Sequence, residues 1–227
     1  FKFQFFFCSY IYMKDVIIIL TTTVNVFDVD KMYQKSKKDR IDTYNRSLSE
    51  WLKTDFKIIV VDNSGYKYPE FKENARFKKI SYTYDSIRIP FGSYFIKNTK
   101  NKGDHEMLSI MYAYKNIPIF WKYNKIFKLT GRYYIPDFNK FIKKIPNTFK
   151  FYIQNNSNRC ELFGTDKLYF LKLFILPKRN EQHINLENKK KKIIEMLHEQ
   201  NYNIYKFPKI PVNNVIKGSS NRIIYSL

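Results

Sequence analysis

The stretch "DVIIIL", Asp15–Leu20, decides the fold class of this chain of 227 residues, and three threonines, Thr21, Thr22 and Thr23, follow it directly. Its apolar residues form a continuous run of strand length, with β-branched side chains that favour extended structure. A run without polar alternation is typical of a strand that is buried on both faces, as in a parallel sheet. We therefore expect a central strand here, with a polar loop at its carboxyl end.

The next segment predicts a parallel partner for this strand. Ile41, Tyr44, Leu48 and Leu52 recur at helical spacing, and a second buried run, "FKIIVVDNSG" over Phe56–Gly65, comes after them. Strand, helix and strand in this order form a βαβ unit, whose two strands lie parallel in one sheet.

The rest of the chain continues this alternation. Further strands are expected at 79–84, 127–135 and 149–156, and helices at 104–117 and around 186–197, the latter with Lys189 to Lys192 on its solvent side. Glu161–Leu176 combines a predicted turn at Gly164 and Thr165 with an apolar strand or helix, and residues 205–227 predict a closing loop with one or two edge strands. We predict a single α/β domain over residues 13–227, with a mixed, mostly parallel sheet flanked by helices.

Residues 1–12, "FKFQFFFCSYIY", precede Met13, and we expect them to lie outside the domain. The run is too broken for a membrane span, and no small-residue cleavage site follows it. It is either sequence ahead of a start at Met13 or an arm that touches a membrane weakly. Cys8 and Cys160 form no Cys-x-x-Cys pattern, which favours a reducing compartment, and we expect the cytoplasm.

The net charge of +21 raises the question of nucleic-acid binding. The basic residues are mostly lysines spread along the whole chain, and Lys, Asn, Ile, Phe and Tyr are enriched together, as in AT-rich coding sequences. Arginine, the better reader of bases and phosphates, is scarce. We therefore expect no specific nucleic-acid partner, and a basic protein that binds single strands stays as an alternative.

Three polar segments follow predicted parallel strands, and ligands of open α/β sheets bind beyond such strand ends. The first segment offers hydroxyl and amide groups. The second offers a carboxylate and an amide for a base or ribose, and the third offers a fixed positive charge suited to a diphosphate. Together they predict a site for a nucleotide with a phosphate bridge. The segments are Thr21-Thr22-Thr23, Asp62-Asn63-Ser64 and Thr130-Gly131-Arg132.

Common signatures of other enzyme classes are missing from the sequence. There is no Gly-x-Gly-x-x-Gly, no Gly-x-x-x-x-Gly-Lys-Ser/Thr and no Gly-x-Ser-x-Gly. His105, His183 and His198 show no metal-ligand spacing. Each of the three polar segments taken alone also has a structural interpretation, as a turn or as a strand-forming stretch.

The ordered set of elements resembles the nucleotide-diphospho-sugar transferase (GT-A) fold of glycosyltransferases, which is Rossmann-like. More narrowly, "DHEMLSIMYAY" with "KLTGRYYI", and later "RCELFGTDKLYF" and "NNVIKGSSNRI", resemble small glycosyltransferase domains of large DNA viruses and of bacterial surface-polysaccharide loci. The resemblance covers roughly Met13 to the C-terminus. It implies transfer of a hexosyl or deoxyhexosyl group from a nucleotide-diphosphate sugar to a glycan or related hydroxyl acceptor. For a viral protein the compartment would be the host cytoplasm. A catalytically inactive transferase-like domain is a further alternative.

The resemblance also implies roles for single residues. Thr21 and Thr22 match the loop that meets the nucleotide, Asp62 matches the carboxylate that contacts base or ribose, and Tyr133 could stack on sugar or base. The expected donor-binding residues are Thr21, Thr22, Thr23, Asp62, Asn63, Lys102, Glu106, Thr130, Gly131 and Tyr133.

The expected metal site departs from the family pattern. Where this fold usually carries Asp-x-Asp for Mn²⁺ or Mg²⁺, the chain reads Thr130-Gly131-Arg132, so the metal requirement stays open. Either Arg132 neutralises the leaving diphosphate, or a carboxylate such as Asp137 holds a metal ion. Asp28 and Asp30 form an Asp-x-Asp in the first loop, which we interpret as helix capping.

The expected catalytic residues are Arg132 and a carboxylate after the fifth strand. An inverting transfer needs such a carboxylate to deprotonate the acceptor, and Glu161 and Asp166 are the local candidates. Both could equally be ordinary turn charges, and a retaining reaction would need no such base.

Overall fold

The computed structural model describes residues 15–25, 36–83, 102–118, 122–155, 159–174, 186–216 and 222–227. The extension over residues 1–12, with Cys8, lies outside the described residues, and so do Asp28, Asp30 and His183.

A seven-stranded sheet in the order β3-β2-β1-β4-β6-β5-β7 forms the centre of the described part of the chain. The strands β3, β2, β1 and β4 are parallel, whereas β6 runs antiparallel to β4 and to β5. The predicted mixed, mostly parallel α/β sheet is confirmed. The strands are β1 Val16–Thr22, β2 Lys57–Asp62, β3 Phe77–Ser81, β4 Lys125–Thr130, β5 Phe151–Ile153, β6 Leu162–Asp166 and β7 Ile204–Lys206.

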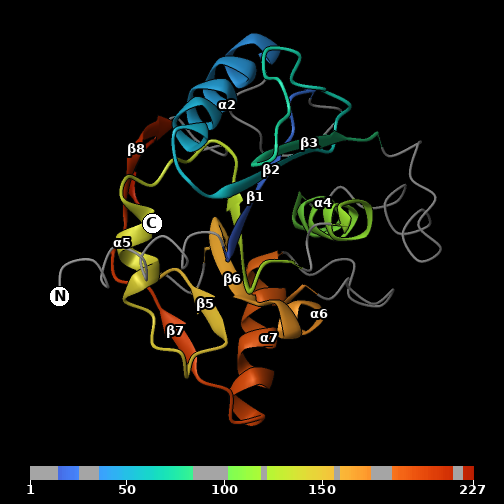
Figure 1. Ribbon diagram of the computed structural model, residues 1–227. Helices are drawn as coiled ribbons and strands as arrows, with labels where there is room; N and C mark the ends of the chain where they lie inside the picture. Colours follow the sequence, from blue (N-terminus) through green and yellow to red (C-terminus); the bar gives the residue numbers. More distant parts are fainter. Residues whose placement is uncertain are drawn as a thin grey trace, which may run out of the picture.

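Helices cover both faces of this sheet (Figure 1). On one face lie α2 (Lys37–Leu52) and α5 (Phe138–Lys143), together with a two-stranded sheet of β8 (Pro211–Ile216) and β9 (Ile223–Ser226). The other face is covered by α4 (Lys102–Asn116), α6 (Phe170–Leu173) and α7 (Leu186–Glu199). No helix in the described ranges is both long and apolar enough to cross a membrane.

The strands send alternate side chains into the two layers, as the pleat of a β-strand requires. In β1, Ile17 and Ile19 join the core under α4, and Ile18 and Leu20 join the core under α2. In β4 the same alternation places Ile126 under α4 and Phe127 and Leu129 under α2. The polar residues at the ends of β1 and β4 continue this alternation, so each of them points into one of the two layers.

Two details correct the sequence-based expectations. Gly164 and Thr165 do not form a turn but lie inside β6, with Gly164 opposite Phe127 of β4. A Cβ on Gly164 would lie 2.5 Å from Phe127 Cδ1, so this glycine is needed for close packing. Lys190 is not on the solvent side of α7, because its side chain is buried at 3% exposure.

Candidate functional site

The strand order changes direction between β1 and β4. From β1 the sheet continues through β2 to β3 on one side, and β4 lies on the other side. In open α/β sheets this arrangement leaves a crevice beyond the carboxyl ends of the two strands, where ligands bind. Thr21 pairs with Thr130 in the β1–β4 register, so the first and third polar segments meet at this point.

Gly131 brings the end of β4 directly against β1. Its amide N–H donates to the carbonyl oxygen of Thr21 at 2.8 Å. A Cβ on Gly131 would lie 2.4 Å from Thr22 Cγ2 and 3.0 Å from the Thr21 oxygen. The glycine of the Thr130-Gly131-Arg132 segment is therefore required by the approach of two strand ends.

Glu106 of α4 connects the two strand ends on one face of the sheet. Its Oε1 accepts hydrogen bonds from Thr21 Oγ1 at 2.7 Å and Thr130 Oγ1 at 3.2 Å. The same oxygen lies 2.6 Å from the Nζ of Lys128, whose side chain is 0% exposed. Lys128 Nζ also donates to the carbonyl oxygen of Cys160 at 2.6 Å, so this buried charge is both paired and hydrogen-bonded.

Asp62 ties together the loops after β1 and β2. Its Oδ2 accepts from Thr22 Oγ1 and the Val24 amide, both at 3.0 Å. Its Oδ1 accepts from the Ser64 amide and hydroxyl at 2.8 and 2.6 Å and from the Tyr66 amide at 3.0 Å. Burial raises the pKa of Asp62, and these hydrogen bonds oppose the shift. The contact of Asp62 with a base or ribose stays a prediction, because a ligand would have to replace one of these donors.

Asn63, next in the chain, is the residue of this segment with an unused polar atom. Its side chain is buried, and its Oδ1 has no hydrogen-bond partner in the described part of the chain. The Asn63 amide donates to the carbonyl oxygen of Thr22 at 3.2 Å, which holds the second polar segment against the end of β1.

Arg132 lies on the opposite face, under α2. Its guanidinium carbon is 6.0 Å from the ring centre of Tyr44, and that of Arg40 is 5.5 Å from the same ring. Arg40 donates to the Thr23 carbonyl and to Tyr44 Oη, at 2.5 and 2.8 Å. Burial lowers the pKa of Arg40, and the nearby charge of Arg132 also lowers it. Two guanidinium groups thus share a buried environment that would accept an anion.

Arg132 itself has a hydrogen-bond donor that the described residues do not use. It is 8% exposed, and within the described ranges its Nη1 has no hydrogen-bond partner. A buried guanidinium N–H without an acceptor is costly, which makes this N–H a candidate donor to a ligand.

Glu161 lies beside the end of β4, where its carbonyl oxygen accepts from the Thr130 amide at 2.9 Å. Its Oε1 accepts from Nε and Nη2 of Arg159, at 2.9 and 2.6 Å, and its buried Oε2 has no partner among the described residues. Burial acts to raise the pKa of Glu161, but the charge and hydrogen bonds of Arg159 and the charge of Lys128 outweigh it, so the pKa is lowered. Glu161 is therefore ionised at neutral pH, as a general base must be, and its lowered pKa makes it a weaker base than an unpaired glutamate.

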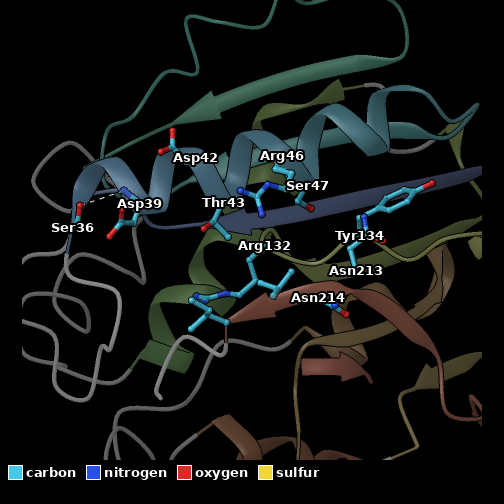
Figure 2. Close-up of a pocket in the computed structure, with 12 residues that line it drawn as sticks. Ser36, Asp39, Asp42, Thr43, Arg46, Ser47, Arg132, Tyr134, Asn213 and Asn214 are labelled. Carbon is cyan, nitrogen blue, oxygen red and sulfur yellow. Dashed lines mark hydrogen bonds between the residues drawn. The ribbon is translucent and has the colours of Figure 1, made fainter. Parts of the chain in front are cut away.

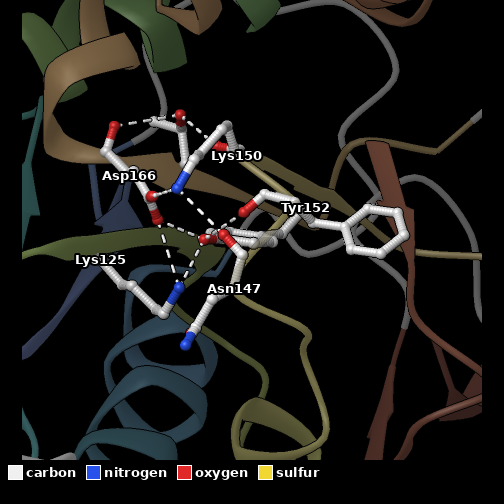
Figure 3. A network of polar contacts seen from close by, with 7 residues as sticks. Lys125, Asn147, Lys150, Tyr152 and Asp166 are labelled. Carbon is white, nitrogen blue, oxygen red and sulfur yellow. Dashed lines mark hydrogen bonds and ion pairs between the residues drawn. The ribbon is translucent and has the colours of Figure 1, made fainter. Parts of the chain in front are cut away.

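Asp166, the second candidate base, is not brought to this site. It pairs with Lys125, the first residue of β4, and so lies about 16 Å from Thr130 by the rise of a strand. There it contacts Lys125 Nζ at 3.3 Å, Lys150 Nζ at 3.2 Å and the hydroxyl of Tyr152 (Figure 3). Asp166 cannot reach a ligand at the other end of β4, which leaves Glu161 as the candidate base.

The structure also shows the surroundings of Tyr133 and the place of Lys102, two further residues that we expected to contact the donor. Tyr133 is a core residue, and its carbonyl oxygen accepts from Trp51 Nε1 at 2.9 Å. Burial raises the pKa of Tyr133 to about 12. Lys102 is the first residue of α4, so its backbone lies on the helix that supplies Glu106. The predicted contacts of Tyr133 and Lys102 with a donor stay predictions.

The described residues at this strand end include few side chains that could bind a metal ion. They hold no group of three or more His, Cys, Asp or Glu side chains that could bind a metal ion. Arg132 places a positive charge in the segment where the resemblance leads us to expect carboxylates, and Lys128 lies two residues before Thr130. Asp137 precedes α5 and pairs on the surface with Lys140 at 2.9 Å. A requirement for Mn²⁺ or Mg²⁺ stays a prediction.

Sequence reasoning missed several basic residues at this end of the sheet. Lys128 could have been found, because it interrupts the apolar strand "KIFKLT" two residues before Thr130 and therefore shares its face. Arg40 lies one helical turn before Tyr44 in α2, on the face that packs against the sheet. Lys190, which donates to the carbonyl oxygen of Arg159, shows no comparable sequence signal.

A pocket of about 730 Å³ lies next to this site, between α2 and β8 (Figure 2). Arg132 and Tyr134 reach it from the loop after β4. Its lining residues are Ser36, Asp39, Asp42, Thr43, Arg46, Ser47, Arg132, Tyr134, Asn213, Asn214, Val215 and Ile216.

No protein-family model and no curated protein matches the sequence. Among solved structures, the chain is similar to a protein from Desulfovibrio desulfuricans described as a nucleotide-diphospho-sugar transferase, with 12% identity and a TM-score of 0.49 over 86% of this chain and 80% of that chain. It is also similar to the inositol-1-phosphate CTP transferase from T. maritima, with 11% identity and a TM-score of 0.46 over 86% and 85% of the two chains. A cytidylyltransferase from Leptospira borgpetersenii serovar Hardjo-bovis gives 11% identity and a TM-score of 0.45 over 86% and 76%. Because these TM-scores lie below 0.5, the function of this chain has to be inferred from its own site.

Proposed function

We propose that this protein is a glycosyltransferase that binds a nucleotide-diphosphate sugar at the carboxyl ends of β1 and β4 and transfers the sugar to a hydroxyl acceptor. One observation carries the proposal: the buried Arg132, with an unused N–H, directly follows the Gly131 contact at the point where the strand order changes direction. That is where this class of sheet binds its ligands.

The charge at this end of the sheet supports an anionic ligand. The contacts described above bring five cations and three carboxylates to this end of the sheet, on its two faces together, which leaves two positive charges in excess. The cations are Arg40, Lys128, Arg132, Arg159 and Lys190, and the carboxylates are Asp62, Glu106 and Glu161. A nucleoside diphosphate supplies the matching negative charge. Charged groups that are already in place stabilise charge that develops on a leaving group at little cost in reorganisation.

The chemistry can be assigned to residues of this chain. The acceptor oxygen forms a bond to the anomeric carbon of the donor, and the bond from that carbon to the diphosphate oxygen breaks with its electron pair. The acceptor proton passes to Glu161, which is ionised at neutral pH and whose Oε2 has no partner among the described residues. Arg132 faces the charge that grows on the departing nucleoside diphosphate.

A screen of nucleotide sugars tests the proposal. Each donor is incubated with the protein, with and without Mn²⁺ or Mg²⁺, and the released nucleotide is identified. We expect slow release of a nucleoside diphosphate from at least one donor, because transferases of this kind also transfer the sugar to water. Release of a monophosphate would instead indicate attack at phosphorus. If no donor is cleaved and none raises the melting temperature, the proposal is wrong.

A further inference from the structure

The pocket between α2 and β8 has a polar but neutral lining. Asp39 and Asp42 offset Arg46 and Arg132, and no lysine is among its lining residues. This balance stands out in a chain whose net charge is +21. A pocket for a phosphate or another polyanion would carry excess positive charge, which this lining taken as a whole does not have.

Two buried polar atoms of this lining have no partner in the described part of the chain. They are Oγ of Ser47, in the middle of α2, and Nη1 of Arg132. Ser47 is 4% exposed and Arg132 is 8% exposed, and both side chains reach the same pocket (Figure 2). Because buried polar groups in folded proteins are nearly always hydrogen-bonded, Ser47 Oγ indicates a polar ligand in this pocket, whereas Arg132 Nη1 is the donor that the proposed function assigns to the diphosphate.

The remaining lining provides donors, acceptors and a flat apolar surface. Asn213 and Asn214 bring side-chain amides from β8, and the Asn213 amide N–H holds that strand to the Tyr134 carbonyl oxygen at 3.2 Å. The Tyr134 ring packs edge-on against Trp51 with ring centres 5.1 Å apart, so it is fixed in place. Hydroxyl-rich ligands with apolar ring faces match this combination of amides, carboxylates and an aromatic ring.

We infer that this pocket binds a neutral carbohydrate and presents one of its hydroxyl groups to the donor site as the acceptor. The inference rests on the proposed function for the role as acceptor, but the carbohydrate site itself can be tested without a donor. The volume of about 730 Å³ lies within the range of roughly 300–1,000 Å³ that is usual for small-molecule sites. Arg132 belongs both to the pocket lining and to the strand end where the diphosphate is proposed to bind, so the two ligands would be neighbours.

Binding of simple glycosides provides the test. Methyl α-glucoside, methyl β-galactoside, methyl α-mannoside, maltotriose and glucuronate are titrated against the full chain and followed by saturation-transfer NMR, with and without UDP or GDP. We expect at least one neutral glycoside to bind and glucuronate to bind more weakly. If no neutral glycoside binds with or without nucleotide, or if glucuronate binds best, the inference is wrong.

Matched variants locate the binding site. Asp42→Asn changes a carboxylate of the pocket whose surface partner is Lys38 at 3.2 Å, and Asp55→Asn changes a similarly exposed carboxylate that pairs with Arg76 at 2.8 Å, outside the pocket. We expect Asp42→Asn to weaken glycoside binding about threefold to tenfold, as for one hydrogen bond, and Asp55→Asn to leave it unchanged. Equal effects of the two variants would contradict the location.

A variant that fills the pocket tests in a second way where the glycoside binds. Ser47→Leu places an apolar side chain in the pocket, and we expect it to abolish glycoside binding, provided that its thermal transition shows a folded protein. Asn214→Ala, on the exposed strand β8, avoids the core and should weaken binding about threefold. Glycoside binding that survives in both variants would overturn the inference. Donor cleavage by the unmodified protein decides the proposed function separately.

Discussion

The two ends of β4 carry similar charges but differ in how these charges are satisfied. At the amino end, Asp166 contacts Lys125, Lys150 and Tyr152, and each of its carboxylate oxygens has a partner (Figure 3). At the carboxyl end, Arg132 and Glu161 each keep one buried polar atom without a partner in the described residues. The first group of charges is satisfied within the protein, as expected of a structural ion pair. The second has unused hydrogen-bonding capacity, as expected of a ligand-binding site.

The comparison of the two ends shows how structural and functional charges can be distinguished in this fold. Charge alone does not distinguish the two ends, because each has a lysine of β4 paired with a carboxylate: Lys125 with Asp166, and Lys128 with Glu106. Unused hydrogen-bonding capacity and position in the sheet do distinguish them, since a buried unpaired group persists only where something compensates it.

Arg132→Ala should have the largest effect on ligand binding. A nucleotide sugar at about 100 times its dissociation constant stabilises a protein by about 2.7 kcal/mol, or roughly 5–11 °C in a chain of this size. We expect differential scanning fluorimetry to show this rise for the unmodified protein and not for Arg132→Ala. The melting temperature without ligand should not fall, because an incompletely satisfied buried charge is removed.

Lys150→Ala is the matched control, because it removes a cation from the other end of β4. It should lower the melting temperature without ligand slightly and keep the whole ligand-induced rise. A loss of that rise in Lys150→Ala, or its survival in Arg132→Ala, would reverse our assignment of the two ends.

Gly131→Ala should destabilise the carboxyl end itself. The new Cβ would meet Thr22 Cγ2 at 2.4 Å, which predicts a loss of about 1–3 kcal/mol from overpacking. Removing the clashing methyl group in the double variant Gly131→Ala/Thr22→Ser should recover part of this loss in urea unfolding. An unchanged unfolding midpoint in the single variant would show that the strand ends are not in close contact.

Asp166→Asn should affect stability without affecting ligand binding. The change removes the charge that pairs with Lys125 and Lys150 but keeps one hydrogen-bond acceptor, so we expect a loss of about 1–2 kcal/mol in chemical unfolding. Donor cleavage, measured at a temperature where the variant is folded, should stay at the level of the unmodified protein. A selective loss of cleavage would return Asp166 to the list of catalytic residues.

Glu161→Gln should have a small effect on stability that depends on pH. Because the pKa of Glu161 in the folded protein lies below its ordinary value of 4.5, the ionised form stabilises the fold at pH values above 4.5. This contribution is lost as the pH falls through the folded-state pKa. The melting temperature of the variant should thus lie below that of the unmodified protein at pH 7, by an amount equivalent to about 0.5–1.5 kcal/mol, and approach it in acid as the pH falls through the folded-state pKa. A constant difference over this range would show that Glu161 is not held ionised by Arg159.

The sequence predicts most of the sheet because its strands are read from local patterns. The unbroken run Val16–Leu20 and the run around Lys57–Val61 correspond to β1 and β2, and the meeting of Thr21 with Thr130 follows from parallel pairing. The strand containing Gly164 was missed as a strand, because its glycine serves packing against Phe127, which lies 37 positions away in the chain. Such tertiary requirements leave no periodic signal.

For the same reason, the sequence predicts only part of the candidate site. Thr130, Gly131, Arg132 and Glu161 are found from the expected ends of strands, since this position is set by local sequence. The separation of Asp166 from Glu161 is not found, because the intervening residues were expected to turn at Gly164 but continue as a strand to the far end of β4. The hydrogen bonds of Asp62 with the amides of two loops are not found either, because only the fold reveals how these loops approach each other; its contact with a ligand stays a prediction.

Hydrogen–deuterium exchange, measured with and without a nucleotide sugar that serves as a donor, shows whether the donor binds at the carboxyl ends of β1 and β4. The account predicts slower amide exchange on donor binding in residues 21–25 and 128–133, at the carboxyl ends of β1 and β4, and no change in residues 147–152 near Asp166. Protection confined to residues 147–152, or no protection at either strand end under saturating donor, would contradict it.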